Sequence, residues 1–223
     1  MKSYQALAAL LDYPSAELIA ALPEIRALLE SESQLSGAAT AQLSPLLDRL
    51  SSVDLMDLQE AYVDLFDRSR ATSLNLFEHI HGEDRDRGQA MVDLKYKYHQ
   101  AGFELIAHQL PDYLPVLLEY LSQLSSEEAV DMLSECSHIL QSIGTALIKR
   151  QSPYAGVFSW LLEHAGEGEL QSREPDPTIV SAADDDSSPE ALDRAWAETP
   201  ITFMGGCAPS QPAVVRFHKG APS

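Results

Sequence analysis

Apolar residues in the first 166 positions recur at intervals of three and four, which places them on one face of an α-helix. The clearest example is predicted over residues 127–150. Its apolar stripe consists of Ala129, Leu133, Cys136, Leu140, Ile143 and Leu147. Ser125 and Glu128 form a capping box that starts this helix. The same part of the chain contains no convincing alternation of apolar and polar residues, so the pattern predicts an all-α fold.

Seven further helices are predicted, separated by Ser, Asp, Gly and Pro. They are expected at 3–11, 15–30, 37–50, 53–66, 85–100, 111–124 and 153–166. The connections between them are short, and short connections join antiparallel neighbours around one core. We therefore predict a single-domain helical bundle.

The composition changes near residue 166. Residues 167–223 contain seven of the thirteen prolines and the acidic run Asp184–Asp186. Such a segment cannot bury enough apolar surface to form a second core. We expect residues 1–166 to form the folded domain and residues 167–223 to be a mobile acidic tail, with one short helix at 189–198.

Charge and composition exclude several classes of function. The chain has 15 Lys and Arg against 34 Asp and Glu, a formal net charge of −19, so nucleic acid is not an expected partner but a cationic peptide is. The longest apolar stretch, Ala6–Leu11, is far shorter than the roughly 20 residues that cross a bilayer. We expect a cytoplasmic protein without membrane insertion. Its two cysteines form no CxxC motif and are expected to be free thiols.

Residues 77–84 hold the densest group of potential metal ligands, including His79 and His81. On a helix these two rings point about 200° apart, so they share a metal only if the backbone is extended. One interpretation is a small metal-dependent hydrolase built on the two histidines, and the other is a helix end with structural hydrogen bonds. Neither a Gly-x-Ser-x-Gly motif nor a phosphate-binding loop occurs, so the motifs give little support to an enzyme, and no bound cofactor is expected.

The segment 110–121 combines two prolines with two acids. Pro111 and Pro115 are both expected in the first turn of a helix, where proline is tolerated. Asp112 and Glu119 are seven positions apart, which puts them on nearly one face of that helix, about 10 Å apart. Such a pair would bracket arginines on a bound helix. Alternatively, Asp112 complements the helix N-terminus and Glu119 is solvated.

Four segments resemble the NarJ-type assembly chaperones of respiratory nitrate reductase, a branch of the maturation chaperones for twin-arginine-exported molybdoenzymes. They are EAYVDLFDR at 60–68, TSLNLFEHIHGE at 72–83, RDRGQAM at 85–91 and the segment 111–121. The resemblance covers about residues 1–166, and 196–203 is similar to the family's C-terminal pattern. In the wider family His usually follows the Pro-Asp pair, whereas Tyr113 stands here, so a role for an imidazole at this position does not carry over.

The resemblance implies a system-specific chaperone without catalytic activity. Such a protein binds the N-terminal segment of the apo catalytic subunit of nitrate reductase, and holds that subunit competent for insertion of the molybdenum cofactor and iron–sulfur clusters before membrane attachment. Another molybdoenzyme of the same class is the alternative client. An acidic helical protein suits a basic amphipathic segment.

The expected binding site is an apolar groove with an acidic rim. The residues expected to bind the peptide are Tyr62, Asp64, Leu65, Phe66, Phe77, His79, His81, Asp112, Tyr113 and Glu119. The three acids Asp64, Asp112 and Glu119 are expected at the rim. For Leu65 a plain core position remains open, because it lies on the apolar stripe of its helix.

Overall fold

The computed structural model describes residues 1–31, 37–81, 85–105, 109–168 and 170; for 37–40, 81, 85 and 86 it describes the backbone alone. The α-helices are α1 Lys2–Leu11, α2 Ala16–Ser31, α3 Gly37–Ser52, α4 Leu55–Tyr62, α5 Glu78–His81, α6 Arg85–Gln100, α7 Leu114–Gln123, α8 Ser126–Glu135, α9 Ser137–Lys149 and α10 Ala155–His164. A π-helical turn η1 (Val63–Asp67) and a 3₁₀ turn η2 (Arg70–Thr72) follow α4. The described residues contain no strand, only one isolated bridge, so the predicted all-α fold is confirmed.

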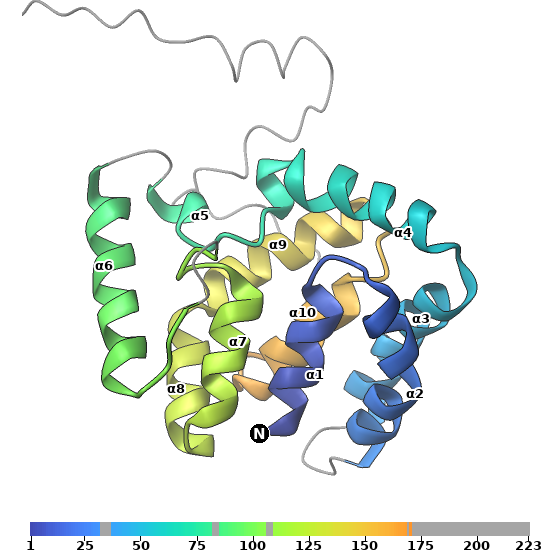
Figure 1. The fold of residues 1–223 in the computed structure, drawn as a ribbon, viewed down its shortest axis with the longest axis horizontal. Helices are drawn as coiled ribbons and strands as arrows, with labels where there is room; N and C mark the ends of the chain where they lie inside the picture. The colour runs from blue at the N-terminus through green and yellow to red at the C-terminus, as the bar shows by residue number, and fades with distance from the viewer. Residues whose placement is uncertain (32–36, 82–84, 106–108, 169, 171–223) are drawn as a thin grey trace, which may run out of the picture. The chain divides into compact units, whose positions relative to one another are not determined.

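Helix α1 packs antiparallel against α7 at the centre of the helical unit (Figure 1). The Met1 amino group donates to the Ser122 carbonyl at 2.7 Å, and at the other end of α1 the Tyr113 hydroxyl lies 3.5 Å from Asp12. Tyr4 and Leu7 of α1 are fully buried. The antiparallel pair brings the C-terminal end of α1 to the first residues of α7.

Every residue of helix α10 from Gly156 to Leu162 is buried, as expected of a helix enclosed by others. Phe158 and Trp160 are almost completely buried, and the Trp160 ring packs edge-to-face on Tyr4 of α1 with ring centres 6.1 Å apart. The helix as a whole contacts α3 and α9. At Gly156, a Cβ atom would lie 2.1 Å from the carbonyl oxygen of Gln42 on α3, so only glycine permits this close approach. Gly166 ends the helix with a φ of +80°, and the N–H of Glu167 reaches back to the Leu162 carbonyl at 3.0 Å.

The predicted helix over 127–150 is wrong in one respect, because the chain breaks at Cys136 into α8 and α9. Cys136 has φ −95° and ψ 0°, and its N–H bonds to Leu133 in a tightened turn. The capping box of Ser125 and Glu128 is confirmed. Helix α8 contacts α7 and also α10, whereas α9 packs mainly against α10 and η2, so the chain turns where its packing partners change. Burial raises the pKa of the Cys136 thiol to about 11, which keeps it neutral.

The predicted helix over 53–66 begins as expected but ends in the π-turn η1. The Asp54 side chain caps α4 by accepting from Met56 N–H at 2.9 Å. The Arg68 N–H then bonds five residues back to Val63 at 3.1 Å. The buried Thr72 hydroxyl donates to the Leu65 carbonyl, which the wider turn leaves available.

Five further predicted helices correspond to α1, α2, α3, α6 and α10 within a few residues. The remaining predicted helix, over 111–124, begins only at Leu114 as α7, so Pro111 and Asp112 precede it. The chain separates into two units, residues Met1–Ser187 and Ser188–Ser223, and everything described belongs to the first. The helix expected at 189–198 lies outside the described residues. No helix in the described ranges has the length and apolar content needed to span a membrane.

Candidate functional site

Tyr62 joins the ends of three helices. It lies in the last turn of α4, is 4% exposed, and donates its hydroxyl proton to the Leu11 carbonyl of α1 at 2.8 Å. Its oxygen is also 3.0 Å from the hydroxyl of Tyr113, which immediately precedes α7. A phenol has one proton, so Tyr113 is the donor in this second bond. The motif residue Tyr62 therefore anchors the site to α1 and α7.

Four more aromatic rings surround Tyr62, and we call the five together the aromatic cluster: Tyr13, Tyr62, Phe66, Tyr113 and Tyr154. The Tyr62 ring centre is 4.8 Å from Phe66 and 5.6 Å from Tyr13, and Phe66 is 5.0 Å from Tyr154. Edge-to-face pairs at these distances stabilise one another. Tyr62, Phe66 and Tyr154 are buried, but Tyr13 is 46% exposed. Tyr13 is thus the ring that an external apolar group can reach.

Three exposed carboxylates lie near the aromatic cluster, and we call them the acidic rim: Asp12, Asp67 and Glu119. Asp64, which was also predicted at the rim, is exposed but forms a salt bridge with Arg68 at 2.5 Å, so its charge is already compensated. Partial burial raises the pKa of Glu119, and the charge of Asp12 raises it further. Partial burial also raises the pKa of Asp67. Burial chiefly raises the pKa of Tyr113 to about 12, with smaller contributions from the charges of Asp12 and Asp67. Clustered negative charge of this kind favours an approaching cation.

A pocket of about 220 Å³ adjoins the aromatic cluster between the end of α3, α4 with η1, and the turn before α10. Tyr62 and Tyr154 belong to the aromatic cluster and also line this pocket. Leu65, for which a plain core position remained open, is half-buried and lines this pocket. Most of the remaining wall is aliphatic. The predicted groove residues Tyr62, Leu65 and Phe66 are therefore neighbours here.

A long-range junction, which we call the clasp, holds Tyr113 in place. Residues 73–79 run against residues 111–114, with an antiparallel bridge between Asn75 and Tyr113. Leu114 N–H donates to Leu74 at 2.8 Å, and Leu76 N–H donates to the Asp112 carbonyl at 3.0 Å. The clasp fixes the backbone on both sides of the Tyr113 ring.

The rim position predicted for Asp112 is wrong, because its side chain is fully buried in the clasp. It accepts from the Phe77 N–H at 3.1 Å and lies 3.9 Å from the Arg87 guanidinium. Burial raises its pKa, against the Phe77 hydrogen bond and the charge of Arg87, which both lower it. Since α7 begins only at Leu114, Asp112 and Glu119 do not share a helix face. Glu119 is exposed and remains at the rim.

His79 and Phe77 also belong to the clasp. His79 is fully buried, with Nε2 2.8 Å from the Ser73 carbonyl, and burial lowers its pKa so that the ring is neutral. Both His79 and His81 lie in helix α5, so the extended backbone required for a shared metal is absent. The part of the chain that the structure describes has no group of three His, Cys, Asp or Glu residues suited to a metal. The side chain of His81 lies outside the described residues.

Four residues of the site escaped prediction: Asp12, Tyr13, Asp67 and Tyr154. For two of them the sequence offers a clue, which is a neighbouring proline at a helix boundary. Tyr13 precedes Pro14, and Tyr154 follows Pro153. Proline at a boundary fixes the backbone of the loop that carries the neighbouring ring. The Pro14 carbonyl accepts from Gln59 Nε2 at 2.9 Å, which ties the Tyr13 loop to α4.

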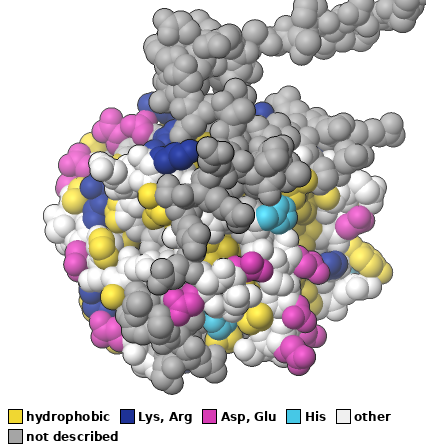
Figure 2. Space-filling model, turned by 180° about the vertical axis from the view of Figure 1, so that it is seen from behind, with side chains coloured by type: hydrophobic (Ala, Val, Ile, Leu, Met, Phe, Trp, Pro, Cys, Tyr) yellow, Lys and Arg dark blue, Asp and Glu magenta, His cyan; other side chains and the backbone are white. Residues whose placement is uncertain are grey.

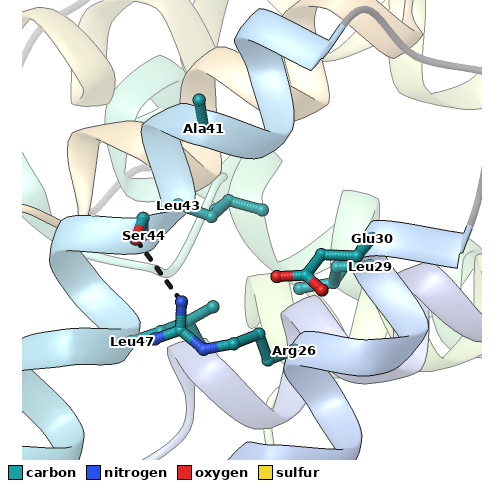
Figure 3. A pocket seen from close by; sticks show the side chains of 7 residues that line it. All are labelled: Arg26, Leu29, Glu30, Ala41, Leu43, Ser44 and Leu47. Atoms are coloured by element: carbon teal, nitrogen blue, oxygen red, sulfur yellow. Dashed lines mark hydrogen bonds between the residues drawn. The ribbon is translucent and has the colours of Figure 1, made fainter.

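A second pocket, of about 340 Å³, lies between α2 and α3. Figure 3 shows Arg26 and Glu30 of α2 facing Ser44 of α3. Arg26 is paired with Asp48 at 2.6 Å, so its charge is already compensated. Figure 2 shows acidic side chains spread over the described surface opposite to the view of Figure 1, so negative charge is not confined to the rim. The aromatic cluster with its acidic rim combines a partly exposed aromatic ring, Tyr13, with nearby carboxylates.

Comparison with known proteins finds a matching family model and several similar proteins. The model of the family described as nitrate reductase delta subunit matches residues 30–159. The nitrate reductase molybdenum cofactor assembly chaperone NarJ of Escherichia coli K12 is 42% identical over 203 residues, covering 90% of this chain and 85% of that protein. The probable assembly chaperone NarW of the same organism is 36% identical over 92% of this chain and 84% of its own length.

A more distant relative is the probable assembly chaperone NarJ of Bacillus subtilis, which is 31% identical over 72% of this chain and 86% of its own length. The family match spans the clasp, α4 with η1, and the first half of α10. Match length and identity together show that this chain belongs to the nitrate reductase delta subunit family, the family of the NarJ-type assembly chaperones.

Proposed function

We propose that this chain is a client-specific assembly chaperone of the nitrate reductase system. It binds the N-terminal segment of the apo catalytic subunit and holds that subunit competent for insertion of the molybdenum cofactor and iron–sulfur clusters, before membrane attachment. The names of the curated relatives support the assembly role. The observation that carries the binding role is the partly exposed Tyr13 ring beside Tyr62, surrounded by the acidic rim.

The chemistry of this site suits a cationic amphipathic helix. Its apolar face would cover Tyr13 and enter the pocket beside Leu65, while its Lys or Arg side chains would approach the acidic rim. Charge attraction of this kind speeds association and selects against acidic segments. Apolar burial against an aromatic ring supplies most of the affinity.

The chaperone acts by binding the client segment and catalyses no reaction. While the segment is bound, it is unavailable for docking elsewhere, so the subunit stays accessible to the machinery that inserts its cofactors. This action needs no nucleophile, and the half-buried Cys136 thiol and the buried His79 ring are both neutral. We place this activity in the cytoplasm, where the apo subunit is synthesised, and in residues 1–166, with 167–223 as a tail.

The test is the molybdenum content of the client. Nitrate reductase is produced in a host that lacks its own NarJ-type protein, with and without this chain, and molybdenum is measured per catalytic subunit. We expect the metal content to fall severalfold without the chain and to be restored by it. Full molybdenum loading in its absence would contradict the proposal. If another molybdoenzyme is the client, that enzyme and not nitrate reductase will show the loss.

A further inference from the structure

The pocket beside the aromatic cluster is bordered by two arginines, Arg49 and Arg150. This is unusual in a chain whose 34 acids outnumber its 15 Lys and Arg residues. The other ten lining residues are uncharged, and they include the four leucines Leu46, Leu50, Leu58 and Leu65. None of the twelve is acidic. The pocket therefore combines an apolar wall with positive charge, the reverse of the acidic rim.

The two arginines differ in how they are held. Arg150 donates to the buried Ser69 hydroxyl at 2.9 Å, which fixes its guanidinium against η2. Arg49 is exposed in the last turn of α3, and within the described part of the chain it takes part in no salt bridge. Burial raises the pKa of Tyr154 to about 12, and the nearby positive charge of Arg49 acts in the opposite direction by lowering that pKa. The charge of Arg49 is thus directed at the aromatic cluster and is not compensated.

The size of the pocket favours a side chain over a small-molecule cofactor. Small-molecule sites are typically about 300–1,000 Å³, whereas this pocket holds about 220 Å³. Its wall of Leu46, Leu50, Leu58 and Leu65 suits one large apolar side chain. Its charge suits a carboxylate, since a guanidinium pairs with that group through two parallel hydrogen bonds.

We infer that this pocket receives an apolar side chain of the client segment and that Arg49 pairs with a carboxylate next to it. The inference rests on the proposed function. Because Tyr62 and Tyr154 connect the pocket to the aromatic cluster, the bound segment lies between two ends of opposite charge. Its cationic residues lie at the acidic rim and its acidic residue lies at Arg49. The site thereby fixes the direction of the client segment, and it discriminates against segments that are uniformly basic.

Calorimetry with the full chain tests this inference. The probe is a synthetic peptide of the catalytic subunit's N-terminal segment, together with versions in which each position in turn is replaced by Glu or by Lys. We expect Arg49→Glu to weaken binding of the unmodified peptide about three- to tenfold. At one position the preference should invert: Glu is favoured with wild-type chain and Lys with Arg49→Glu. The matched control is Lys95→Glu on α6, which changes net charge equally at an exposed position outside the pocket.

Each outcome is distinct. An inverted preference at one position with Arg49→Glu, and none with Lys95→Glu, supports the inference. Equal weakening at every position by both variants shows a general effect of net charge and overturns it, while leaving the proposed function standing. No binding of any peptide to the wild-type chain overturns both. Circular dichroism spectra check that the variants are folded, and Arg49→Gln supplies a milder change that should lose the Glu preference without gaining one for Lys.

Discussion

The hydroxyl oxygens of Tyr62 and Tyr113 lie 3.0 Å apart although 51 residues separate them in the chain. One ring comes from the end of α4, and the other comes from the clasp that precedes α7. Tyr62 also donates to the Leu11 carbonyl, so three helix ends meet at this pair of phenols. The shape of the candidate site therefore depends on hydrogen bonds made well below its surface.

Tyr62→Phe tests this dependence. The substitution keeps the ring but leaves the buried Leu11 carbonyl without its donor, and it leaves the Tyr113 hydroxyl with only the Asp12 carboxylate, 3.5 Å away. We expect a loss of about 1–2 kcal/mol in the free energy of unfolding. Urea denaturation measures this value, and Tyr96→Phe at an exposed ring is the control, with a change below about 0.5 kcal/mol. Equal stability of the two variants would contradict the role assigned to the Tyr62 hydroxyl.

Asp112→Asn should alter the pH dependence of stability. Burial raises the folded-state pKa of Asp112, so its contribution is fully present below the unfolded value near 3.8 and is lost as pH rises through the folded value. Asn is always neutral and still accepts from the Phe77 N–H. We expect the unfolding free energy of Asp112→Asn, relative to wild type, to increase between pH 4 and pH 7. A difference that is constant with pH would show that Asp112 has an ordinary pKa.

Gly156→Ala should be strongly destabilising. The new methyl group would lie 2.1 Å from the Gln42 carbonyl oxygen, and a backbone atom cannot yield as a side chain does. We expect a loss of roughly 2–3 kcal/mol from separating α3 and α10. Gly88→Ala on α6 is the matched control, because nothing lies within 4 Å of its added Cβ. That change should stabilise the chain by about 0.5–1 kcal/mol. Thermal unfolding of both variants compares the two, and loss in both or in neither would refute the steric explanation.

Chelators should leave the protein unchanged. His79 is buried on the Ser73 carbonyl in helix α5 and is not placed to share a metal with His81. We expect the same melting temperature with and without EDTA, and no shift on addition of one equivalent of Zn²⁺. His79→Ala, by contrast, should lower the unfolding free energy by about 1–3 kcal/mol, since it leaves the Ser73 carbonyl unpaired. A zinc-dependent rise in melting temperature that His79→Ala abolishes would restore the metal interpretation.

Truncation of the chain tests where the folded domain ends and the tail begins. Leu170 packs against the core, and its side chain lies where a Cβ on Gly144 would be. A chain that ends after Leu170 should therefore unfold at the same urea concentration as the full chain, whereas one that ends at Gly166 should lose about 1 kcal/mol. If the chain ending after Leu170 is markedly less stable than the full chain, residues beyond 170 contribute to the folded unit.

Most helices were predictable from the apolar spacing, because each buries one stripe against its neighbours. The break at Cys136 was not, since the stripe of Leu133 and Leu140 continues across it without Gly or Pro. The break coincides with a change of packing partners, from α7 beside α8 to η2 beside α9, which local sequence does not encode. Asp112 was misplaced for a related reason. Its partner, the Phe77 N–H, is 35 residues away, and no local pattern reports such a contact.

Within the site, the motif around Tyr62, Leu65 and Phe66 was recognisable because it combines family resemblance with helical spacing. Tyr13 and Tyr154 were missed because each lies in a loop at the end of another helix and reaches the cluster only in the folded chain. Arg49 likewise belongs to a different helix from the motif it faces. When each residue of a site comes from a different element, the residues have no regular spacing in the sequence, so no sequence pattern reveals the site.

Calorimetric titration of the full chain with the synthetic N-terminal peptide of the catalytic subunit tests the central claim most directly. The account predicts one peptide per chain, weaker binding as salt rises from 0.1 M to 1 M and the Debye length falls from about 10 Å to about 3 Å, and a loss of at least about tenfold for Tyr13→Ala with Asp12→Asn. Absence of binding at every salt concentration, or an affinity that neither salt nor these two substitutions change, would contradict it.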